Sequence, residues 1–414
     1  MKVLINAYAV CPGMGSEPGM GWHWTTGIAH HCEVYVITES EFREKIEEAV
    51  SRLPQRANIH FFWNETTPEV RKMCWNQGDW RFYWYYEKWQ KRTYHMAKEI
   101  CRKEKIDILH QLNMIGFREP GYLWKLSKET GIPFVWGPTD AKEGFPKAYL
   151  TGLTVKHRMF MTLKSFISKM QLKYNRRVDM AARTAATLLA ASREGVESMR
   201  KYKGLEAVLM NETGCETEDG MTEKNVRKGV LNILWCGKLD VRKQLSLAIR
   251  TMKELKASET EAMLHVVGGG DNAMYVSLAK ECGVEEEITW HGMVNHEEVQ
   301  QLMRRCDIML FTSLAEGTPA VVLEAIANSL PVVCHDCCGM ATAITDEVGR
   351  KIPLSDPTGS VSDFARVIKS LAEDRVTLEE LSRNCGERRK QLSWEKKAEE
   401  MVAIYRKARK KCIR

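Results

Sequence analysis

The chain has 414 residues, of which 44% are hydrophobic and 28% are charged, with a formal net charge of +7. This length suits two ordinary α/β domains with cores of their own, and it excludes a small scaffold that depends on disulfide bonds. No run approaches the ~20 apolar residues of a membrane-spanning helix, and the thirteen cysteines follow no regular spacing, which indicates reduced thiols in a cytoplasmic protein.

The chain opens on an apolar segment, residues 3–9, which we predict to be the first strand. Residues 11–22, CPGMGSEPGMGW, hold so many glycines and prolines that we expect no regular element before Trp22. A glycine-rich loop after a strand is a candidate cradle for a phosphate or a sugar, although such loops also serve only as tight turns.

An aromatic stretch at residues 75–89 follows predicted strands at 34–38 and 58–63 and a helix at 41–52. Its aromatic side chains are interspersed with lysines and arginines. This mixture suits a membrane interface or a platform for a sugar. It suits equally a helix that packs across the domain surface with several aromatics in the core, and the sequence leaves these alternatives open.

Polar side chains follow two further predicted strands, at residues 106–109 and 134–137. The first strand ends at His110 and leads towards Arg118. A histidine at the carboxyl end of a parallel strand can reach a ligand cleft, although a single histidine is more often structural. The second strand precedes the loop PTDAKEGFP, which we expect to expose Asp140 and Glu143 to an acceptor.

The segment 155–183 is strongly basic, with eight lysines and arginines and the single acid Asp179. Its apolar residues are spaced for one face of a helix. A basic amphipathic helix can lie in an anionic lipid interface, where each cation contributes about 1 kcal/mol. The alternatives are a packed helix with a solvated basic face and a nucleic-acid contact, but no recognised nucleic-acid module surrounds the segment. We therefore expect a membrane surface, and no nucleic acid, as a partner.

The second half repeats the alternation of strands and helices after a polar segment at 212–228, which we predict to be a linker. A strand at 231–236 leads into a loop that carries Lys238 and Lys243. Cations in such a loop, beside the start of a helix, suit a diphosphate. A further strand at 288–292 precedes Met293 and Val294.

The stretch 306–339 contains the most informative pattern in the chain. A buried strand at 308–311 leads into a loop with Glu316, and Thr318 and Pro319 then indicate the cap and first turn of a helix that carries Glu324. Free amides at such a helix start bind phosphate. Carboxylates beside an anion site must bind hydroxyls instead, and a nucleotide sugar has both groups. Incidental acids at a solvated helix start are the alternative.

A cysteine cluster follows this stretch, in the sequence CHDCC at residues 334–338. The spacing C-x2-C is half of a zinc site, but no second pair stands at a suitable distance in the sequence. We therefore expect no metal. Helices are predicted at 361–372, 378–389 and 393–409.

Three motifs resemble retaining glycosyltransferases of family 4. EGTPAVVLEA, with Glu316 and Glu324, fits that family's E-x7-E signature. GKLDVRKQ resembles its G-R-L-x-x-x-K-G pattern, with Lys238 in place of the arginine and Gln244 in place of the glycine. GSEPG at residues 15–19 resembles the N-terminal loop of a bacterial branch.

The resemblance implies an α/β protein of the GT-B fold, with two Rossmann-like, doubly wound domains that face a central cleft. We expect an N-terminal acceptor domain at 1–211, the linker at 212–228, a donor domain at 229–392, and a C-terminal helix at 393–414 that crosses back to the first domain. The implied enzyme is retaining, independent of metals and without a required cofactor.

The resemblance also implies roles for individual residues. Lys243 and Lys238 stabilise the departing diphosphate, Glu316 holds the donor sugar and Glu324 the ribose; catalytic roles fall on Glu316, Lys243 and His110. The donor-binding residues are Gly15, Lys238, Lys243, Met293, Val294, Glu316, Gly317, Thr318, Pro319 and Glu324. The acceptor residues are Glu17, Arg118, Asp140 and Glu143.

The expected function is transfer of a hexose-type sugar from a UDP- or GDP-sugar to a membrane-associated or polysaccharide acceptor, with an α-linked product. A lipid-linked or glycan acceptor places the enzyme at the inner, cytoplasmic face of a membrane. The alternatives are a nucleotide-sugar epimerase or a phosphorylase-like enzyme on the same fold, and a non-catalytic protein that binds nucleotide sugars at a membrane.

Overall fold

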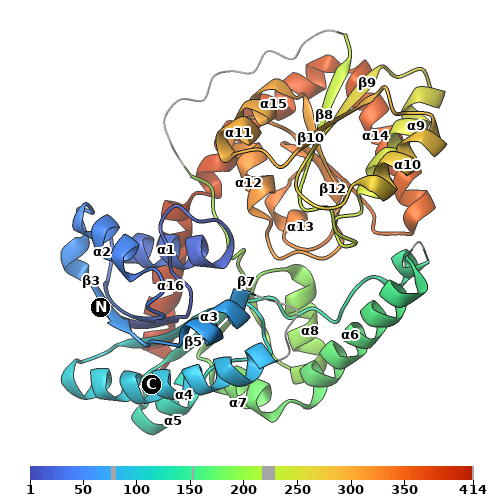
Figure 1. Ribbon diagram of the computed structural model, residues 1–414. Coiled ribbons are helices and arrows are strands. Elements are labelled where there is room, and N and C mark those ends of the chain that lie inside the picture. The colour runs from blue at the N-terminus through green and yellow to red at the C-terminus, as the bar shows by residue number, and fades with distance from the viewer. Residues whose placement is uncertain (76–80, 152, 217–228, 413–414) are drawn as a thin grey trace. The chain divides into compact units, whose positions relative to one another are not determined.

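A computed structural model describes residues 1–75, 81–151, 153–216 and 229–412, and the chain divides into two compact units (Figure 1). Unit 1 comprises Met1–Glu143, Ser168–Thr213 and Trp394–Arg414, and unit 2 comprises Gly144–Ile167 and Gly214–Ser393. Most of the predicted linker, residues 217–228, lies outside the described residues.

Unit 1 is built on a seven-stranded parallel sheet with the strand order β3-β2-β1-β4-β5-β6-β7. Helices cover both of its faces, so most strand residues are apolar and buried, and the polar residues Asn6, His110 and Gln111 are buried as well. The strands are β1 (Lys2–Ala7), β2 (Glu33–Thr38), β3 (Ile59–Trp63), β4 (Ile108–Asn113), β5 (Phe134–Thr139), β6 (Thr187–Ala190) and β7 (Val208–Leu209).

The helices of unit 1 pack against the sheet in two layers. The first layer comprises α1 (Ser16–Ile28), α2 (Arg43–Ser51) and the C-terminal helix α16 (Trp394–Cys412). The second layer comprises α4 (Arg81–Lys103), α5 (Leu123–Thr130), α7 (Arg176–Thr184) and α8 (Arg193–Lys203). Unit 1 also contains α3 (Pro68–Trp75) and the short 3-10 helix at Arg56–Asn58. The 3-10 helix at Lys147–Leu150 belongs to unit 2, and α6 (Val155–Tyr174) begins in the part of the chain grouped with unit 2 and ends in unit 1.

Unit 2 repeats the design with a six-stranded parallel sheet, ordered β10-β9-β8-β11-β12-β13. Its strands are β8 (Leu231–Cys236), β9 (Ala262–Val267), β10 (Ile288–Gly292), β11 (Ile308–Phe311), β12 (Val332–His335) and β13 (Gly349–Ile352). One face is covered by α9 (Leu245–Ala257), α10 (Ala273–Cys282) and α14 (Pro357–Glu373). The other is covered by α11 (His296–Arg305), α12 (Ala320–Ala327) and α13 (Met340–Ala343), and α15 (Arg375–Gln391) packs against α12.

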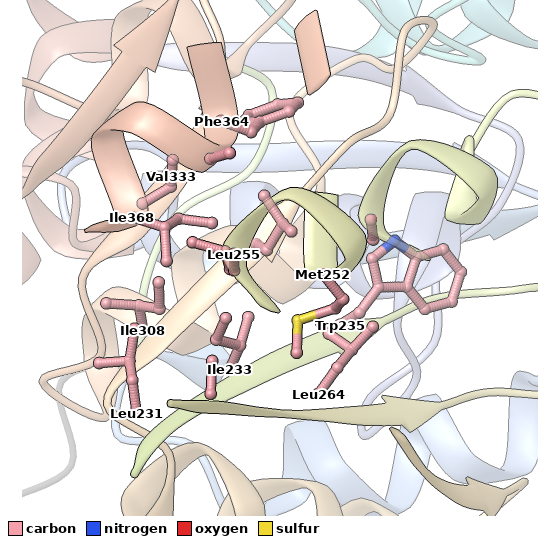
Figure 2. Close-up of a cluster of buried hydrophobic side chains, with 14 of the residues drawn as sticks. Leu231, Ile233, Trp235, Met252, Leu255, Leu264, Ile308, Val333, Phe364 and Ile368 are labelled. Atoms are coloured by element: carbon pink, nitrogen blue, oxygen red, sulfur yellow. The ribbon is translucent and has the colours of Figure 1, made fainter. Parts of the chain in front are cut away.

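The core of unit 2 fixes the sheet from which the site described below is built. Figure 2 shows side chains from β8, β9 and β11 interlocking with side chains from α9 and α14. Trp235 is almost fully buried, and its Nε1 donates a hydrogen bond to Thr312 Oγ1 at 3.0 Å. The one polar atom of this indole is therefore satisfied inside the core.

Both sheets reverse their strand order beside their first strand. The reversal lies between β1 and β4 in unit 1 and between β8 and β11 in unit 2. Such switch points are where open parallel sheets bind ligands, at the carboxyl ends of the strands. The predicted pair of Rossmann-like, doubly wound domains is confirmed.

Two local predictions in the first half are wrong. Helix α1 begins at Ser16, within the glycine-rich stretch that we expected to be irregular up to Trp22. Pro18 is compatible with this start because it lies in the first turn, where its missing N–H has no partner to lose. The basic segment 155–183 is not one helix but two, because the Asn175 side chain accepts from the amides of Arg177 and Val178 and caps α7.

The grouping of residues 144–167 with unit 2 differs from the predicted boundary of the N-terminal domain at 211. Phe145 and Tyr149 are buried in a small apolar cluster with Leu247, Leu314 and Val361. This cluster of aromatic and aliphatic side chains attaches the segment to unit 2.

The aromatic stretch divides between core and surface. Phe82, Tyr86 and Trp89 on α4 are buried and pack against Tyr8, whereas Trp84 on the same helix is about half exposed. The interpretation as a packed helix therefore accounts for the three buried aromatic side chains, Phe82, Tyr86 and Trp89. Residues 76–80 lie outside the described part of the chain. In the described residues we find no helix that combines the length and the apolar character needed to cross a membrane.

We predict that Ile308→Ala lowers the free energy of unfolding by about 2–5 kcal/mol, because it leaves a cavity at a fully buried site in β11. Urea denaturation of the full chain measures the change. The control is Val376→Ala on α15, where the side chain is 68% exposed and we expect a change within about 0.5 kcal/mol. Equal losses in both variants would contradict this description of the core.

Candidate functional site

Lys243 and Glu316 meet at the switch point of unit 2. Lys243 precedes α9, and Glu316 lies in the loop after β11. Lys243 Nζ is 2.8 Å from Glu316 Oε1, which also accepts a hydrogen bond from Ser313 Oγ at 2.7 Å. The two charged side chains are only 13% and 15% exposed. The ion pair is thus held in place and partly shielded from water.

The loop after β11 also fixes the backbone that carries Lys243. Leu314 N donates to the carbonyl of Arg242 at 3.0 Å, and Ser313 Oγ, whose proton goes to Glu316, lies 3.2 Å from the same carbonyl oxygen. Thr312 Oγ1 donates to the carbonyl of Lys243 at 2.7 Å. Because β8 and β11 are neighbours in the sheet, these hydrogen bonds join the two loops at their carboxyl ends.

Gln244 occupies a backbone conformation that normally favours glycine. Its φ is +51°, in the left-handed region, and the family 4 pattern has glycine at this place. Its side chain is buried, and Nε2 donates to the carbonyl of Val241 at 2.6 Å. This hydrogen bond offsets part of the roughly 1–2 kcal/mol that a left-handed conformation costs other residues.

Two glycines let the loops of this edge approach one another closely. At Gly268, with φ of +144°, a Cβ would lie 1.8 Å from the carbonyl oxygen of Gly237. At Gly339, a Cβ would lie 2.4 Å from Thr318 Oγ1. The loops that follow β8, β9, β11 and β12 therefore converge, and any larger residue at either glycine would separate them.

Helix α12 begins one residue later than predicted. Its N-cap is Pro319, so the prediction that Thr318 caps the helix is wrong. No side chain caps the first turn, which leaves its amide groups available to an anion. Gly317 joins Glu316 to this start.

Glu324 lies inside α12 and is largely buried, and this burial raises the pKa of its carboxyl group. The same carboxylate adds to the effect of burial in raising the pKa of the Cys236 thiol to about 11. Because Cys236 ends β8, Glu324 also faces the β8–β11 switch point. The unit thus places two acids, Glu316 and Glu324, on this edge.

The remaining donor residues differ in how firmly they are held. Lys238 is exposed in the turn after β8, Met293 is 83% exposed after β10, and Val294 packs against the core of unit 2. Arg242 is a cation of this edge that the sequence did not single out, paired with Asp240 at 2.8 Å. Arg242 could have been found from the sequence, because it stands directly before Lys243 in the motif GKLDVRKQ.

Unit 1 carries a second polar group at its own switch point. Glu17 Oε1 accepts a hydrogen bond from Ile115 N at 3.2 Å, while Oε2 is buried without a hydrogen-bond partner. Burial raises the pKa of Glu17 to about 7. Asp140 N donates to the carbonyl of the same Ile115 at 2.8 Å, so the backbone of Asp140 and the side chain of Glu17 both bind this loop residue. Gly15 is the N-cap of α1.

The predicted acceptor residues do not form one group. We expected Asp140 to be exposed, but its side chain is only 25% exposed and its Oδ1 lies 3.2 Å from Lys142 Nζ. Burial raises the pKa of Asp140 although Lys142 opposes the shift. Glu143 instead pairs with Lys201 at 2.5 Å, and Arg118 donates to Gln171 at 2.7 Å.

The structure places His110 inside unit 1, and the catalytic role predicted for this residue stays a prediction. The ring is fully buried, with Nε2 donating to the carbonyl of Gly137 at 2.7 Å and Nδ1 accepting from the Tyr405 hydroxyl at 2.6 Å. Burial lowers the pKa of His110 to about 4, so the imidazole is neutral at pH 7. Both ring nitrogens are thus engaged in hydrogen bonds within unit 1.

The cysteine cluster lies at the end of β12, and Cys334, Cys337 and Cys338 are buried. Cys338 Sγ accepts from the Glu316 amide at 3.5 Å, so this loop supports the site. Among the described residues, no group of three His, Cys, Asp or Glu side chains is placed to hold a metal ion.

Comparison with known proteins relates this geometry to a class of enzymes. Residues 218–392, less than half of the chain, match the family model for glycosyl transferases group 1. The D-inositol 3-phosphate glycosyltransferase of Kribbella flavida is 27% identical over 193 residues, which are 44% of this chain and 45% of that protein. The chain spans less than half the length of the curated relatives it matches.

Solved structures match nearly the whole chain. The lipopolysaccharide outer core galactosyltransferase WaaB in its apo form is 15% identical, with a TM-score of 0.64 over 97% of this chain and 99% of that chain. Anabaena HepE in complex with UDP is 14% identical, with a TM-score of 0.63 over 98% and 99%. These likenesses show the fold, which is the Rossmann-like two-domain architecture of GT-B proteins.

We predict that Glu17→Gln removes a pH dependence of stability. Its pKa in the folded chain, about 7, exceeds the ordinary value of 4.5, so the folded state binds more protons between these values. The contribution of Glu17 to the free energy of unfolding therefore falls as pH rises from about 4.5 to about 7, by about 3 kcal/mol at most. The variant should gain stability relative to the parent over that window, in urea denaturation at several pH values.

Glu379→Gln, at an exposed carboxyl of α15, is the control and should leave the pH dependence of the parent unchanged. If Glu17→Gln showed the same pH profile as the parent chain, the burial described for Glu17 would be wrong.

Proposed function

We propose that this protein is a retaining glycosyltransferase that moves a hexose-type sugar from a nucleotide-diphosphate sugar to an acceptor and leaves an α-linked product. The observation that carries the proposal is the Lys243–Glu316 ion pair at the β8–β11 switch point. It lies inside the region that matches the group 1 glycosyl transferases. One solved neighbour binds UDP, which supports a UDP-sugar, with a GDP-sugar as the other donor considered.

The donor diphosphate would lie between Lys243 and the uncapped first turn of α12. As the bond between the sugar C1 and the phosphate oxygen breaks, negative charge develops on the leaving diphosphate. Lys243 is 13% exposed, so its positive charge acts there through a medium less polar than water. Lys238 and Arg242 add positive charge at the rim of the same edge.

Glu316 and Glu324 would bind hydroxyl groups of the donor. Without a ligand, Glu316 Oε1 accepts from Lys243 and Ser313. With a donor bound, its carboxylate would accept from sugar hydroxyls and hold C1 in place. Glu324 would bind the ribose, and Met293 and Val294 would lie against the base.

Retention would follow from attack on the same face of the sugar from which the diphosphate leaves. The acceptor oxygen forms a bond to C1, the bond between C1 and the phosphate oxygen breaks, and the acceptor proton passes to the leaving diphosphate. No metal is needed because cations and amides carry the negative charge. No protein nucleophile is needed because the attack is direct.

The acceptor would be bound by unit 1 through Glu17 and Asp140: the Glu17 carboxylate accepts from the Ile115 amide, and the Asp140 amide donates to the Ile115 carbonyl. A lipid-linked or glycan acceptor is the class we propose. Among the neighbours is a lipopolysaccharide outer core galactosyltransferase, which supports this choice. Such an acceptor places the protein in the cytoplasm, peripheral at the inner face of the membrane.

We predict that Lys243→Met reduces sugar transfer by about 10²–10³-fold, since it removes the positive charge nearest the leaving group. Glu316→Gln should also reduce transfer, by about tenfold or more, because it weakens the hydrogen bonds to the donor sugar. Transfer of radiolabelled sugar from UDP- or GDP-sugars to a bacterial lipid and glycan extract measures both effects.

Lys256→Met is the matched control, because Lys256 forms an ion pair of similar length, 2.6 Å to Glu287, far along α9. It should leave transfer within about twofold of the parent. Unchanged transfer in Lys243→Met would refute the assigned role. Conversion of the donor without any acceptor would show an epimerase, and saturable binding without turnover would show a binding protein.

We also predict that the correct donor raises the melting temperature of the parent chain in a panel of UDP-, GDP- and ADP-sugars. The shift should be smaller in Lys243→Met and unchanged in Lys256→Met. A donor that stabilises both variants equally would place the binding site away from the ion pair.

A further inference from the structure

Helix α6 exposes a row of large apolar side chains. Each of them is between 41% and 69% exposed: Val155, Met159, Phe160, Leu163, Phe166, Ile167, Met170 and Tyr174. We call this row the α6 apolar face. So many exposed apolar side chains on one helix mark an interaction surface, because single exposed apolar residues are common on soluble proteins but contiguous patches are not.

The opposite side of α6 is fixed by the protein. Ser165 Oγ accepts from Phe145 N at 3.1 Å, Ser168 Oγ donates to the carbonyl of Lys142 at 2.9 Å, and Leu172 is fully buried. At about 100° per residue, these three lie roughly opposite the centre of the α6 apolar face. The helix is therefore held with its apolar face outward.

Cations flank the α6 apolar face. On the same helical projection, the apolar residues span an arc of roughly 140°, with Lys164 beyond one border and Arg158 and Lys169 beyond the other. Lys156 and Lys173 lie within the arc. The helix contains no Asp or Glu. An apolar band flanked by cations is the pattern of helices that lie in an anionic lipid interface.

The structure restricts the predicted membrane-binding surface of segment 155–183 to helix α6. Two of the three arginines of α7 are engaged within the fold, since Arg177 forms ion pairs with Glu87 and Glu119, and Arg183 pairs with Asp179 at 3.0 Å, whereas Arg176 is exposed. Val178 of the same helix is buried in the core. Helix α7 is thus packed into unit 1, whereas α6 presents a row of exposed apolar side chains together with cations.

We propose that the α6 apolar face inserts into the interface of an anionic membrane, with the flanking cations bound to lipid headgroups. A second copy of the chain is a poorer partner, because two copies of an acid-free, basic face would bring like charges together. Anionic lipid compensates the same charges. The inference builds on the membrane-side acceptor proposed above, but its test does not involve sugar transfer.

The experiment is co-sedimentation of the full chain with vesicles of phosphatidylcholine and phosphatidylglycerol (3:1) at about 0.1 M salt. One variant replaces apolar residues, Phe160→Asn/Leu163→Asn/Ile167→Asn. A second reverses flanking charges, Lys164→Glu/Lys169→Glu. We expect the parent to bind, and each variant to lose about tenfold or more in partitioning. Pure phosphatidylcholine vesicles should bind the parent more weakly.

Matched controls make the same changes elsewhere. Met274→Asn/Val376→Asn alters exposed apolar residues outside α6, and Arg250→Glu/Lys253→Glu reverses exposed cations on α9. Both should bind vesicles within about twofold of the parent, and circular dichroism checks that every variant is folded.

Several outcomes would overturn the proposal. The parent could stay in the supernatant with anionic vesicles, or the apolar variant could bind as well as the parent while the charge variant does not. A dimer in sedimentation velocity that the apolar variant abolishes, without loss of vesicle binding, would assign the face to a second copy. Thermal shifts by nucleotide sugars separate this test from that of sugar transfer, because they should persist in all of these variants.

Discussion

The ion pair between Lys243 and Glu316 is the interaction on which the proposed chemistry depends. A lysine alone at the edge of this sheet would bind a diphosphate, and a glutamate alone would repel it. The two charged groups lie 2.8 Å apart and are largely shielded from water, so each neutralises the other in the absence of ligand. A ligand that offers both phosphates and hydroxyls can bind both groups at once. The parallel sheet makes this arrangement possible because it brings the carboxyl ends of β8 and β11 together.

Much of the fold could be predicted because the central strands are largely buried. The strands predicted at 231–236, 288–292 and 308–311 coincide with β8, β10 and β11, and 308–311 is a continuous apolar run that is buried throughout. The errors lie where one side chain decides the local structure. Asn175 caps α7 and divides the basic segment, and Pro18 is accommodated in the first turn of α1. A single asparagine or proline does not change the spacing of the apolar residues around it, so the apolar pattern does not reveal where these helices begin or end.

The sequence predicted which residues belong to the candidate site, but it did not predict which side chains contact one another. Sequence motifs indicated Lys243 and Glu316, which lie more than seventy positions apart, and the strand order explains why they meet. His110 shows the limit of such reasoning, because its partner Tyr405 belongs to the C-terminal helix, 295 positions away. No local pattern reveals that a histidine at a strand end is enclosed by a distant helix. The exposure of α6 is likewise a tertiary property, since the same periodicity would suit a packed helix.

The most direct test of the central claim is a crystal structure of the full chain with the nucleoside diphosphate, among UDP, GDP and ADP, that raises its melting temperature most. The account predicts that the diphosphate lies within about 3 Å of Lys243 Nζ and of the first amides of α12. A nucleotide bound elsewhere, with the Lys243–Glu316 pair untouched, would contradict it.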